Sequence, residues 1–589
     1  MLTDLHSELR KTGGKGTALA VVALVVLALG LRVWSLNFGL PGVFNMDEKP
    51  ILDRALTFAK GDPNPHNFLY PTLYLYALFA WEGLYFVVGR GLGWFDSVAA
   101  FQNAYFVDGS GHILAARLLT ALCGTATVVG VFWFGARLYG RAVGLAAALF
   151  LAVAPIAVRD AHYVKLDVPV TLFTVLAHAA LAAIVVDQSR ARRRSAWIVA
   201  GLFAGLAIST QYYAAFLAVP FVAVAVSEAH RSGEWSTFGW MLLWAGLATI
   251  AGFVATSPFF VLEPATIVRD FRELREVDID RAVTVALFSS ARVYAELLAV
   301  GALGYAGAGL SLVGAILAWT SDWRRGLVLT SFTLAFLAFV SNTFPASRYL
   351  NIVIPYVAVA AGYSASRLAS MAQSRVAPVM AGICILAAVP AFLESVQWVR
   401  FFGRDDTRTL AKAIIEREVP AGSTVAVQPY SAPIRQSRDG LIEALRAKLG
   451  DESRAPLKYR LQLAATPYPA PAYRVLYLGE SGKTLAPPGD VDKIYIPPRL
   501  FADGDGLGAL RDARVSYVVL TLYGSTPPGL RPLAEALARD GRLMAKISPY
   551  RGAIDPGTAP VPPFRHNGNT WIHPVLERPG PLVEIWRVQ

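Results

Sequence analysis

The segment ALAVVALVVLALGLRVW (residues 18–34) is long and apolar enough to cross a membrane, and NMDEKP (residues 45–50) follows it closely. A helix needs about 20 apolar residues to span roughly 30 Å of hydrocarbon. NMDEKP therefore places two adjacent carboxylates, Asp47 and Glu48, just beyond a membrane helix. Carboxylates so near hydrocarbon are costly unless they are paired or used. The residues alone leave open whether the pair is functional or an ordinary solvated loop.

Hydrophobic runs divide the chain into two parts. Of its 589 residues, 55% are hydrophobic and 16% are charged. Long apolar runs recur to about residue 396 and then stop, and short strand-like runs such as STVAVQ (423–428) and LVEIW (582–586) follow. We therefore predict an α-helical polytopic membrane domain over residues 1–400 and a soluble α/β domain over residues 401–589.

The basic residues predict an orientation for about eleven transmembrane helices. A further apolar segment, residues 69–89, is rich in Tyr and Trp and suits the membrane interface. If it does not cross, the N-terminus, RARRR (190–194) and DWRR (322–325) all face the cytoplasm, as the positive-inside rule prefers. Residues 47, 158–167 and 342–349 and the C-terminal domain then face the exterior. The predicted spans lie near residues 17–36, 113–136, 142–158, 168–187, 196–209, 212–228, 238–257, 294–319, 326–342, 349–366 and 376–396.

The same bias accounts for much of the net charge of +12, because many of the arginines lie in short loops between spans. No basic patch with interleaved aromatic residues accompanies them. We therefore expect no nucleic-acid binding.

Ionisable residues gather in VRDAHYVKLD (158–167), at the exterior end of a predicted span. If the segment is helical, Asp160 and Asp167 are seven residues apart and share a face. We interpret Arg159 as an interfacial anchor. Because five ionisable groups in nine residues are dense for an anchor, the segment favours a polar pocket that also includes His162 and Lys165.

Two further polar stretches interrupt apolar runs. STQYY (209–213) is either a plain exterior turn or a site lining through Gln211 or Tyr212. SRYLNIVIP (347–355) begins a predicted span with Arg348 and Tyr349. An interfacial arginine can extend its charge toward water, or it can bind a phosphate, for which a guanidinium is well suited. The residues do not decide between these roles.

Five stretches in order resemble the polyprenol-phosphate-sugar-dependent transferases, which include protein O-mannosyltransferases and bacterial aminoarabinose transferases. The resemblance covers about residues 17–400, and DDTRTLAKAIIEREVPAGSTVAV (405–427) resembles the entry into the C-terminal domain of bacterial members. It implies a C-type glycosyltransferase fold with an exterior catalytic loop near residues 37–112. The stretches are GDPNPHNFLYPTLYLY (61–76), RLLTALCGTATVVGVFWFGARLYG (117–140), APIAVRDAHYVKLDVPVTLF (154–173), GLFAGLAISTQYYAAF (201–216) and SRYLNIVIPYVAVAAG (347–362).

The resemblance also implies roles for residues. Asp47 would act as general base with Glu48 beside it, and Arg348 would meet the donor phosphate. Many relatives have a lysine where this chain has Gln211, and a neutral amide supplies no charge, so the phosphate would depend on Arg348 and Lys165. The remaining expected substrate-binding residues are His66, Tyr70, Asp160, His162, Asp167, Gln211, Tyr212 and Tyr349.

The expected activity is transfer of a hexosyl or pentosyl group from a polyprenyl-phosphate donor to a hydroxyl of a lipid, glycan or protein acceptor. The expected location is the bacterial inner membrane, with a cytoplasmic N-terminus and an exterior (periplasmic) C-terminal domain. The chemistry requires no cofactor; a divalent metal would be compatible with it, but no pattern supports one. Two alternatives remain: a transporter or flippase for lipid-linked sugars, and a non-catalytic envelope assembly subunit. Transporters place coupling groups near the span centres, where this chain has almost none.

Overall fold

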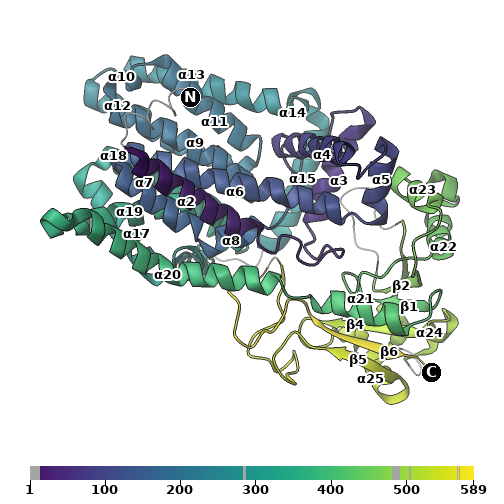
Figure 1. Ribbon diagram of the computed structural model, residues 1–589. Helices are drawn as coiled ribbons and strands as arrows, with labels where there is room; N and C mark the ends of the chain where they lie inside the picture. Colours follow the sequence, from purple (N-terminus) through teal and green to yellow (C-terminus); the bar gives the residue numbers. More distant parts are fainter. Residues whose placement is uncertain are drawn as a thin grey trace. The chain divides into compact units, whose positions relative to one another are not determined.

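The computed structural model describes residues 14–282, 287–480, 491–502, 506–566, 568 and 571–588. The chain divides into two compact units (Figure 1). The first comprises Met1–Leu36, Asp47–Gly83 and Ala115–Val399, and the second comprises Asn37–Met46, Leu84–Leu114 and Arg400–Gln589. The second unit thus includes two segments from the part of the chain before residue 400.

Helices make up the first unit and the segments that run into it. In chain order they are α2 (Gly14–Val33), α3 (Glu48–Thr57), η1 (Phe58–Lys60), α4 (Leu73–Gly91), α6 (Ser110–Tyr139), α7 (Arg141–Ala152), α8 (Pro155–Asp160), α9 (Asp167–Val186), α10 (Gln188–Ala191), α11 (Arg194–Ile208), η2 (Tyr212–Leu217), α12 (Ala218–Ser232), α13 (Trp235–Thr256), α14 (Phe259–Leu262), α15 (Pro264–Ala282), α16 (Ala291–Leu297), η3 (Leu298–Ala302), α17 (Gly304–Ser321), α18 (Trp323–Val340), η4 (Ser347–Ile352), α19 (Ile354–Ala369), η5 (Ser370–Arg375) and α20 (Val376–Phe402).

Seven of the described helices are long and apolar enough to cross a membrane, or eight if the bent pair Ala291–Ala302 and Gly304–Ser321 forms one span. The helical membrane class is as predicted, but the expected count of about eleven spans is higher than this number. Several predicted spans are short or broken. Helix α11 has 15 residues, which at 1.5 Å per residue is about 22 Å and less than the hydrocarbon thickness. Helix α4 is not among the seven.

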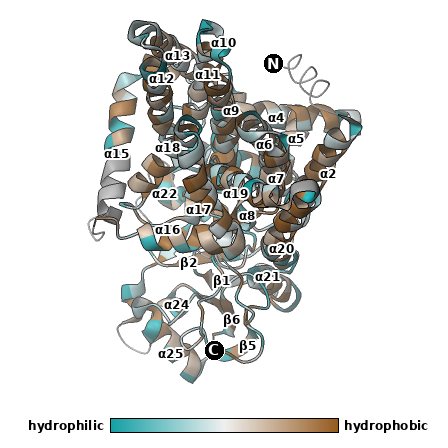
Figure 2. Cartoon of the chain, turned by 90° about the vertical axis from the view of Figure 1, so that its left-hand side faces the viewer, coloured by the Kyte–Doolittle hydropathy of each residue, from teal (hydrophilic) through white to brown (hydrophobic). Residues whose placement is uncertain are grey.

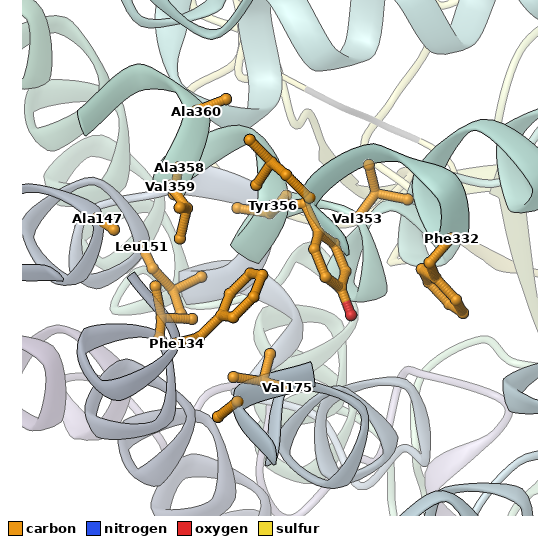
Figure 3. Close-up of a cluster of buried hydrophobic side chains, with 14 of the residues drawn as sticks. Phe134, Ala147, Leu151, Val175, Phe332, Val353, Tyr356, Ala358, Val359 and Ala360 are labelled. Carbon is orange, nitrogen blue, oxygen red and sulfur yellow. The ribbon is translucent and has the colours of Figure 1, made fainter. Parts of the chain in front are cut away.

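Small and aromatic residues pack the core of the first unit. Phe134, Tyr356 and Phe332 come from three helices and meet in one buried cluster (Figure 3). Helix α17 lies against α19 so closely that a side chain at Gly314 would collide with the backbone of Ala360. Close approach at small residues is a common means of holding membrane helices together.

The core of the second unit is a six-stranded sheet with the order β3-β2-β1-β4-β6-β5. Its strands are β1 (Thr424–Val427), β2 (Arg474–Leu478), β3 (Ile494–Ile496), β4 (Tyr517–Leu522), β5 (Arg542–Ile547) and β6 (Leu582–Arg587). The first four strands run parallel, and β6 is antiparallel to both β4 and β5. The predicted strand runs at 423–428 and 582–586 correspond to β1 and β6, so the α/β class of this domain is confirmed. Hydrophobic residues dominate helices such as α2 and α17, whereas hydrophilic residues are frequent in α24 and α25 (Figure 2).

The elements of the second unit that follow α20 alternate between strands and helices, and α5 precedes them in the chain. They are α5 (Val98–Val107), α21 (Thr407–Glu418), β1 (Thr424–Val427), α22 (Arg438–Leu449), η6 (Glu452–Arg454), α23 (Leu457–Ala464), β2 (Arg474–Leu478), β3 (Ile494–Ile496), η7 (Pro498–Phe501), α24 (Gly508–Asp512), β4 (Tyr517–Leu522), η8 (Pro528–Leu530), α25 (Arg531–Asp540), β5 (Arg542–Ile547) and β6 (Leu582–Arg587).

Candidate active site

Asp47 lies at the N-terminal end of α3, where an aspartate commonly accepts a hydrogen bond from the first turn of the helix. Its side chain makes no such capping bond. Instead, its Oδ2 lies 3.3 Å from Lys165 Nζ and 3.4 Å from Arg348 Nη1. Asp47 and Arg348 are each about one-third exposed, whereas Lys165 is nearly buried. Three segments that are distant in the sequence therefore bring one carboxylate and two cations together at an accessible place.

Arg348, in η4, carries a stable positive charge. Burial opposes that charge, but the carboxylates of Asp167 and Asp47 and the Tyr349 hydroxyl outweigh it and raise the pKa of the guanidinium above its ordinary value. The Arg348 guanidinium carbon lies 5.5 Å from the centre of the Tyr349 ring. This residue is therefore a permanent cation beside the Asp47 carboxylate.

Asp167 and Tyr70 complete the polar group around these cations. Asp167 is buried at the start of α9 and accepts a hydrogen bond of 3.1 Å from the Tyr213 hydroxyl. Burial raises the pKa of Tyr70, and the negative charge of Asp47 adds to this effect. A neutral phenol beside a carboxylate and a guanidinium can donate a hydrogen bond to a polar ligand.

Asp160 is held in a separate, buried network. Its Oδ1 accepts a hydrogen bond of 2.8 Å from Arg159 Nε, and its Oδ2 accepts one of 2.7 Å from Asn351 Nδ2. Arg159 also donates to the Ser347 hydroxyl at 2.8 Å. The interpretation of Arg159 as an interfacial anchor is therefore wrong, because the side chain is 4% exposed and ties α8 to η4.

Residues 158–167 do not form one continuous helix, so the condition under which Asp160 and Asp167 would share a face is not met. Helix α8 ends at Asp160 and α9 begins at Asp167. The intervening turn places the two aspartates on different helices, so they do not share a helix face. Lys165 lies in the same turn, and its ammonium is 3.3 Å from Asp47 Oδ2.

His162 lies in that turn and is fully buried. Its ring nitrogens are 2.8 Å from the backbone oxygen of Val158 and 2.9 Å from that of Trp34. Burial lowers the pKa of the imidazole to about 4, against the opposing effect of these two carbonyl groups. The neutral ring has one N–H and can donate it to one of these two backbone oxygens. The fully buried side chain packs the segment rather than facing an open pocket.

Three other expected substrate-binding residues have different neighbours. His66 is exposed, pairs with Asp62 at 2.8 Å and lies 3.7 Å from Glu263. The Tyr212 hydroxyl donates to the backbone oxygen of Phe68 at 3.0 Å. Gln211 precedes η2 and is half-buried, and its side chain does not cap that helix. The polar stretch at 209–213 forms a turn at residues 209–210, and η2 begins at Tyr212.

Helix α15 is attached to the segment that carries Tyr70. The buried carboxylate of Asp270 accepts a hydrogen bond of 2.6 Å from the Phe68 backbone N–H, and Glu263 forms a hydrogen bond with the Asn64 side chain. The guanidinium of Arg54, on α3, lies 5.5 Å from the Tyr70 ring. These contacts fix the segment 64–70, which carries Tyr70, to α15 and α3.

Glu48 pairs with a different cation from those that contact Asp47. It is completely buried and forms a two-pronged ion pair with Arg117, at 2.8 and 2.9 Å. Sequence reasoning missed Arg117, although a charge within the apolar run 113–136 is a signal that an ion-pair partner exists. It also missed Arg54, Asn351 and Asp270.

A metal centre is not formed among the described residues, which contain no group of three or more His, Cys, Asp or Glu side chains arranged to hold an ion. The site consists of carboxylate, ammonium, guanidinium and phenol groups, of which the carboxylate of Asp47 and the guanidinium of Arg348 are the accessible charges. This set can bind an anion and accept a proton.

Comparison with known proteins identifies the fold of the chain. Residues 99–261, less than a third of the chain, match the family model described as dolichyl-phosphate-mannose-protein mannosyltransferase. The crystal structure of ArnT from Cupriavidus metallidurans bound to undecaprenyl phosphate matches with a TM-score of 0.53 and 14% identity, over 97% of this chain and 98% of that one. This is the fold of a C-type glycosyltransferase.

The fold predicted from the sequence is thereby confirmed. ArnT from the same organism in the apo state also matches this C-type glycosyltransferase fold, with a TM-score of 0.51 and 15% identity over 90% of this chain and 96% of that one. No curated protein sequence matches the chain. The segment that matches the family model contains Arg117, Lys165 and Gln211 but neither Asp47 nor Arg348.

Proposed function

We propose that this chain transfers a sugar from a polyprenyl-phosphate-linked donor to an acceptor hydroxyl, with Asp47 as general base. The observation that carries the proposal is the convergence of Lys165 and Arg348 on a single oxygen of Asp47. The bound undecaprenyl phosphate in the ArnT structure supports a lipid phosphate as the donor class. The proposed location is a bacterial inner membrane, with the site on the exterior side.

The reaction balances with the groups present. The acceptor oxygen attacks the anomeric carbon, and Asp47 takes the hydroxyl proton. The bond between the anomeric carbon and the phosphate oxygen breaks, and the electron pair leaves with the lipid phosphate. Cations are most effective where this negative charge develops, which gives Arg348 and Lys165 their role.

Without a donor, the same two cations neutralise Asp47. A donor phosphate would compete with Asp47 for Lys165 and Arg348 and so release its carboxylate for proton transfer. Arg348 suits this task because its planar guanidinium can contact two phosphate oxygens at once. Arg348 and Asp47 are also accessible, whereas the carboxylates of Asp160 and Asp167 are buried.

We assign Glu48 a positioning role in this proposal. Its two oxygens are occupied by Arg117, and Oε1 also accepts a hydrogen bond of 3.1 Å from the Val164 backbone N–H. Val164 directly precedes Lys165. Glu48 therefore connects the start of α3, where Asp47 lies, to the turn that supplies one of the two cations.

The test is Asp47→Asn in the full-length protein, assayed with a panel of polyprenyl-phosphate sugars that includes hexosyl and pentosyl donors. Loss of a general base lowers turnover by about 100-fold or more. The Michaelis constant for the donor should be unchanged or lower, because the variant no longer competes for the cations. Asp53→Asn on the adjoining helix α3 is the matched control, since the Asp53 carboxylate is 43% exposed and lies 3.6 Å from Lys49 Nζ. Equal turnover in the wild type and Asp47→Asn would overturn the assignment.

A further inference from the structure

The segment before Asp47 packs into the second unit of the chain, together with the C-terminal domain. Residues 37–46 belong to this unit, whereas Asp47 begins the next segment of the first unit. Phe38 stacks on Phe402 with ring centres 4.6 Å apart, and it also faces His566 at 5.6 Å. Both Phe38 and Phe44 are nearly buried. The loop is thus part of the C-terminal core rather than a free connection.

Arg408, at the start of α21, contacts the ring of Phe44. Its guanidinium carbon lies 3.7 Å from the centre of the Phe44 ring, and Nε and Nη2 form hydrogen bonds of 2.8 and 2.7 Å with Asp406. Both charged side chains are 1% exposed. A desolvated guanidinium held flat by a carboxylate makes a strong cation–π contact. Phe44 is therefore anchored on a rigid ion pair.

The loop also reaches the residues that follow β1. A side chain at Gly42 would lie 3.0 Å from Pro433 Cγ, and Arg408 Nη1 donates to the Tyr430 backbone oxygen at 3.4 Å. These residues lie beyond the carboxyl end of β1, next to the point where the strand order reverses between β1 and β4. Ligands of open α/β sheets commonly bind there. In this chain residues 37–46 make contacts in that region.

We infer that the C-terminal domain positions the catalytic base, by fixing residues 37–46 through the contact of Phe44 with the Arg408–Asp406 ion pair. The inference rests on the proposed role of Asp47. Three residues span at most about 11 Å, so an anchored Phe44 restricts where Asp47 can lie. Phe44 and Arg408 have a positioning role: they touch no reacting atom and act through the backbone of residues 45–47. The C-terminal domain then contributes to turnover without contributing a catalytic residue.

The experiment compares Phe44→Leu with Phe44→Trp in the full-length protein, using hydrogen exchange of residues 47–52 and steady-state kinetics. Leucine keeps an apolar side chain but removes the ring that faces Arg408, whereas tryptophan retains a ring for the cation. Phe501→Leu is the matched control, because Phe501 is 1% exposed in another part of the same unit. It undergoes the same chemical change without contacting the loop segment.

We expect Phe44→Leu to speed exchange at residues 47–52 and to lower kcat, each by about fivefold or more, with less than a twofold change in KM for the donor. Phe44→Trp should restore both values, and Phe501→Leu should lower the melting temperature without moving either. Unchanged exchange in Phe44→Leu, or an equal rise in Phe501→Leu, overturns the inference. Because exchange needs no substrate, this result is independent of the Asp47→Asn assay that decides the proposed function.

Discussion

Glu48 and Arg117 form a two-pronged ion pair from which solvent is completely excluded, with Nε–Oε1 and Nη2–Oε2 distances of 2.8 and 2.9 Å. Arg117 also donates to the Leu36 backbone oxygen at 2.9 Å. The pair therefore links the start of α3 to α6 and to the end of the segment that contains α2. The adjacent carboxylates of Asp47 and Glu48 therefore lie in different environments: Glu48 is completely buried, and Asp47 is about one-third exposed.

We predict that Glu48→Gln destabilises the fold, because removing one charge from a buried pair leaves the other uncompensated, at a cost of about 3–5 kcal/mol. The measurement is thermal unfolding in detergent. Asp53→Asn on the same helix is the control, and its exposed pair should contribute no more than about 1 kcal/mol. A Glu48→Gln protein that melts like the wild type but turns over a hundredfold more slowly would make Glu48 catalytic instead.

A second prediction concerns the pH dependence of stability. Burial lowers the pKa of His162 to about 4 from its ordinary value near 6.5. Between these values the unfolded chain binds a proton that the folded chain does not, so stability falls as the pH decreases from 6.5 to 4. A difference of this size corresponds to roughly 3 kcal/mol.

The measurement is the melting temperature across that pH range, for the wild type and for His162→Asn. Asparagine can still donate a hydrogen bond to one of the two backbone oxygens but does not titrate, so its curve should be flatter. Parallel curves for the two proteins would show that His162 does not change protonation in this range.

A third prediction concerns orientation in the membrane: residue 193 faces the cytoplasm, and residues 46 and 500 face the exterior. It follows from the positions of the basic loops. Single cysteines at Arg193, Met46 and Leu500, in a background lacking Cys123 and Cys384, can be labelled with an impermeant thiol reagent. All three positions are exposed on the chain, so differences in labelling report the side of the membrane. Labelling of intact cells at position 193 would place the proposed site on the wrong side.

The class of the fold could be predicted from hydrophobic patterning. An apolar run as long as residues 18–34 indicates a transmembrane helix, whereas a short apolar run such as that of β6 indicates a strand. The number of spans could not. Residues 294–319 are mostly apolar and read as one span, but the chain bends by 114° between α16–η3 and α17. Gly304 adopts a φ of +71° at this break, and mean hydropathy does not report such a bend.

The site was partly predictable for a similar reason. Asp47, Lys165 and Arg348 were singled out because each is an ionisable residue beside a predicted span, and Asp47 and Arg348 also match the family resemblance. The sequence could not show that Lys165 and Arg348 meet on the same oxygen of Asp47. It also could not separate Glu48 from Asp47, because the partner of Glu48 lies 69 residues away. Contacts over such separations are set by the packing of the helices.

The last prediction concerns the phosphate contact, where the sequence resemblance implies a lysine and this chain has Gln211. If the donor phosphate depends on Arg348, Arg348→Ala should weaken the donor by about 10- to 100-fold, since a charge-assisted hydrogen bond contributes roughly 1.5–3 kcal/mol. Arg348→Lys should recover only part of this, because an ammonium does not reproduce a two-pronged contact. The measurement is the Michaelis constant for a polyprenyl-phosphate sugar.

Gln211→Lys tests whether a lysine at position 211 can replace the positive charge lost in Arg348→Ala. The variant alone should be tolerated, because Gln211 is half-buried and its side chain does not cap η2. Combined with Arg348→Ala, it should regain part of the lost donor affinity by restoring one positive charge. Wild-type donor binding in Arg348→Ala would reduce Arg348 to a partner of Asp47 and leave Lys165, whose Nζ is 3.3 Å from the same carboxylate oxygen, as the cation that meets the phosphate.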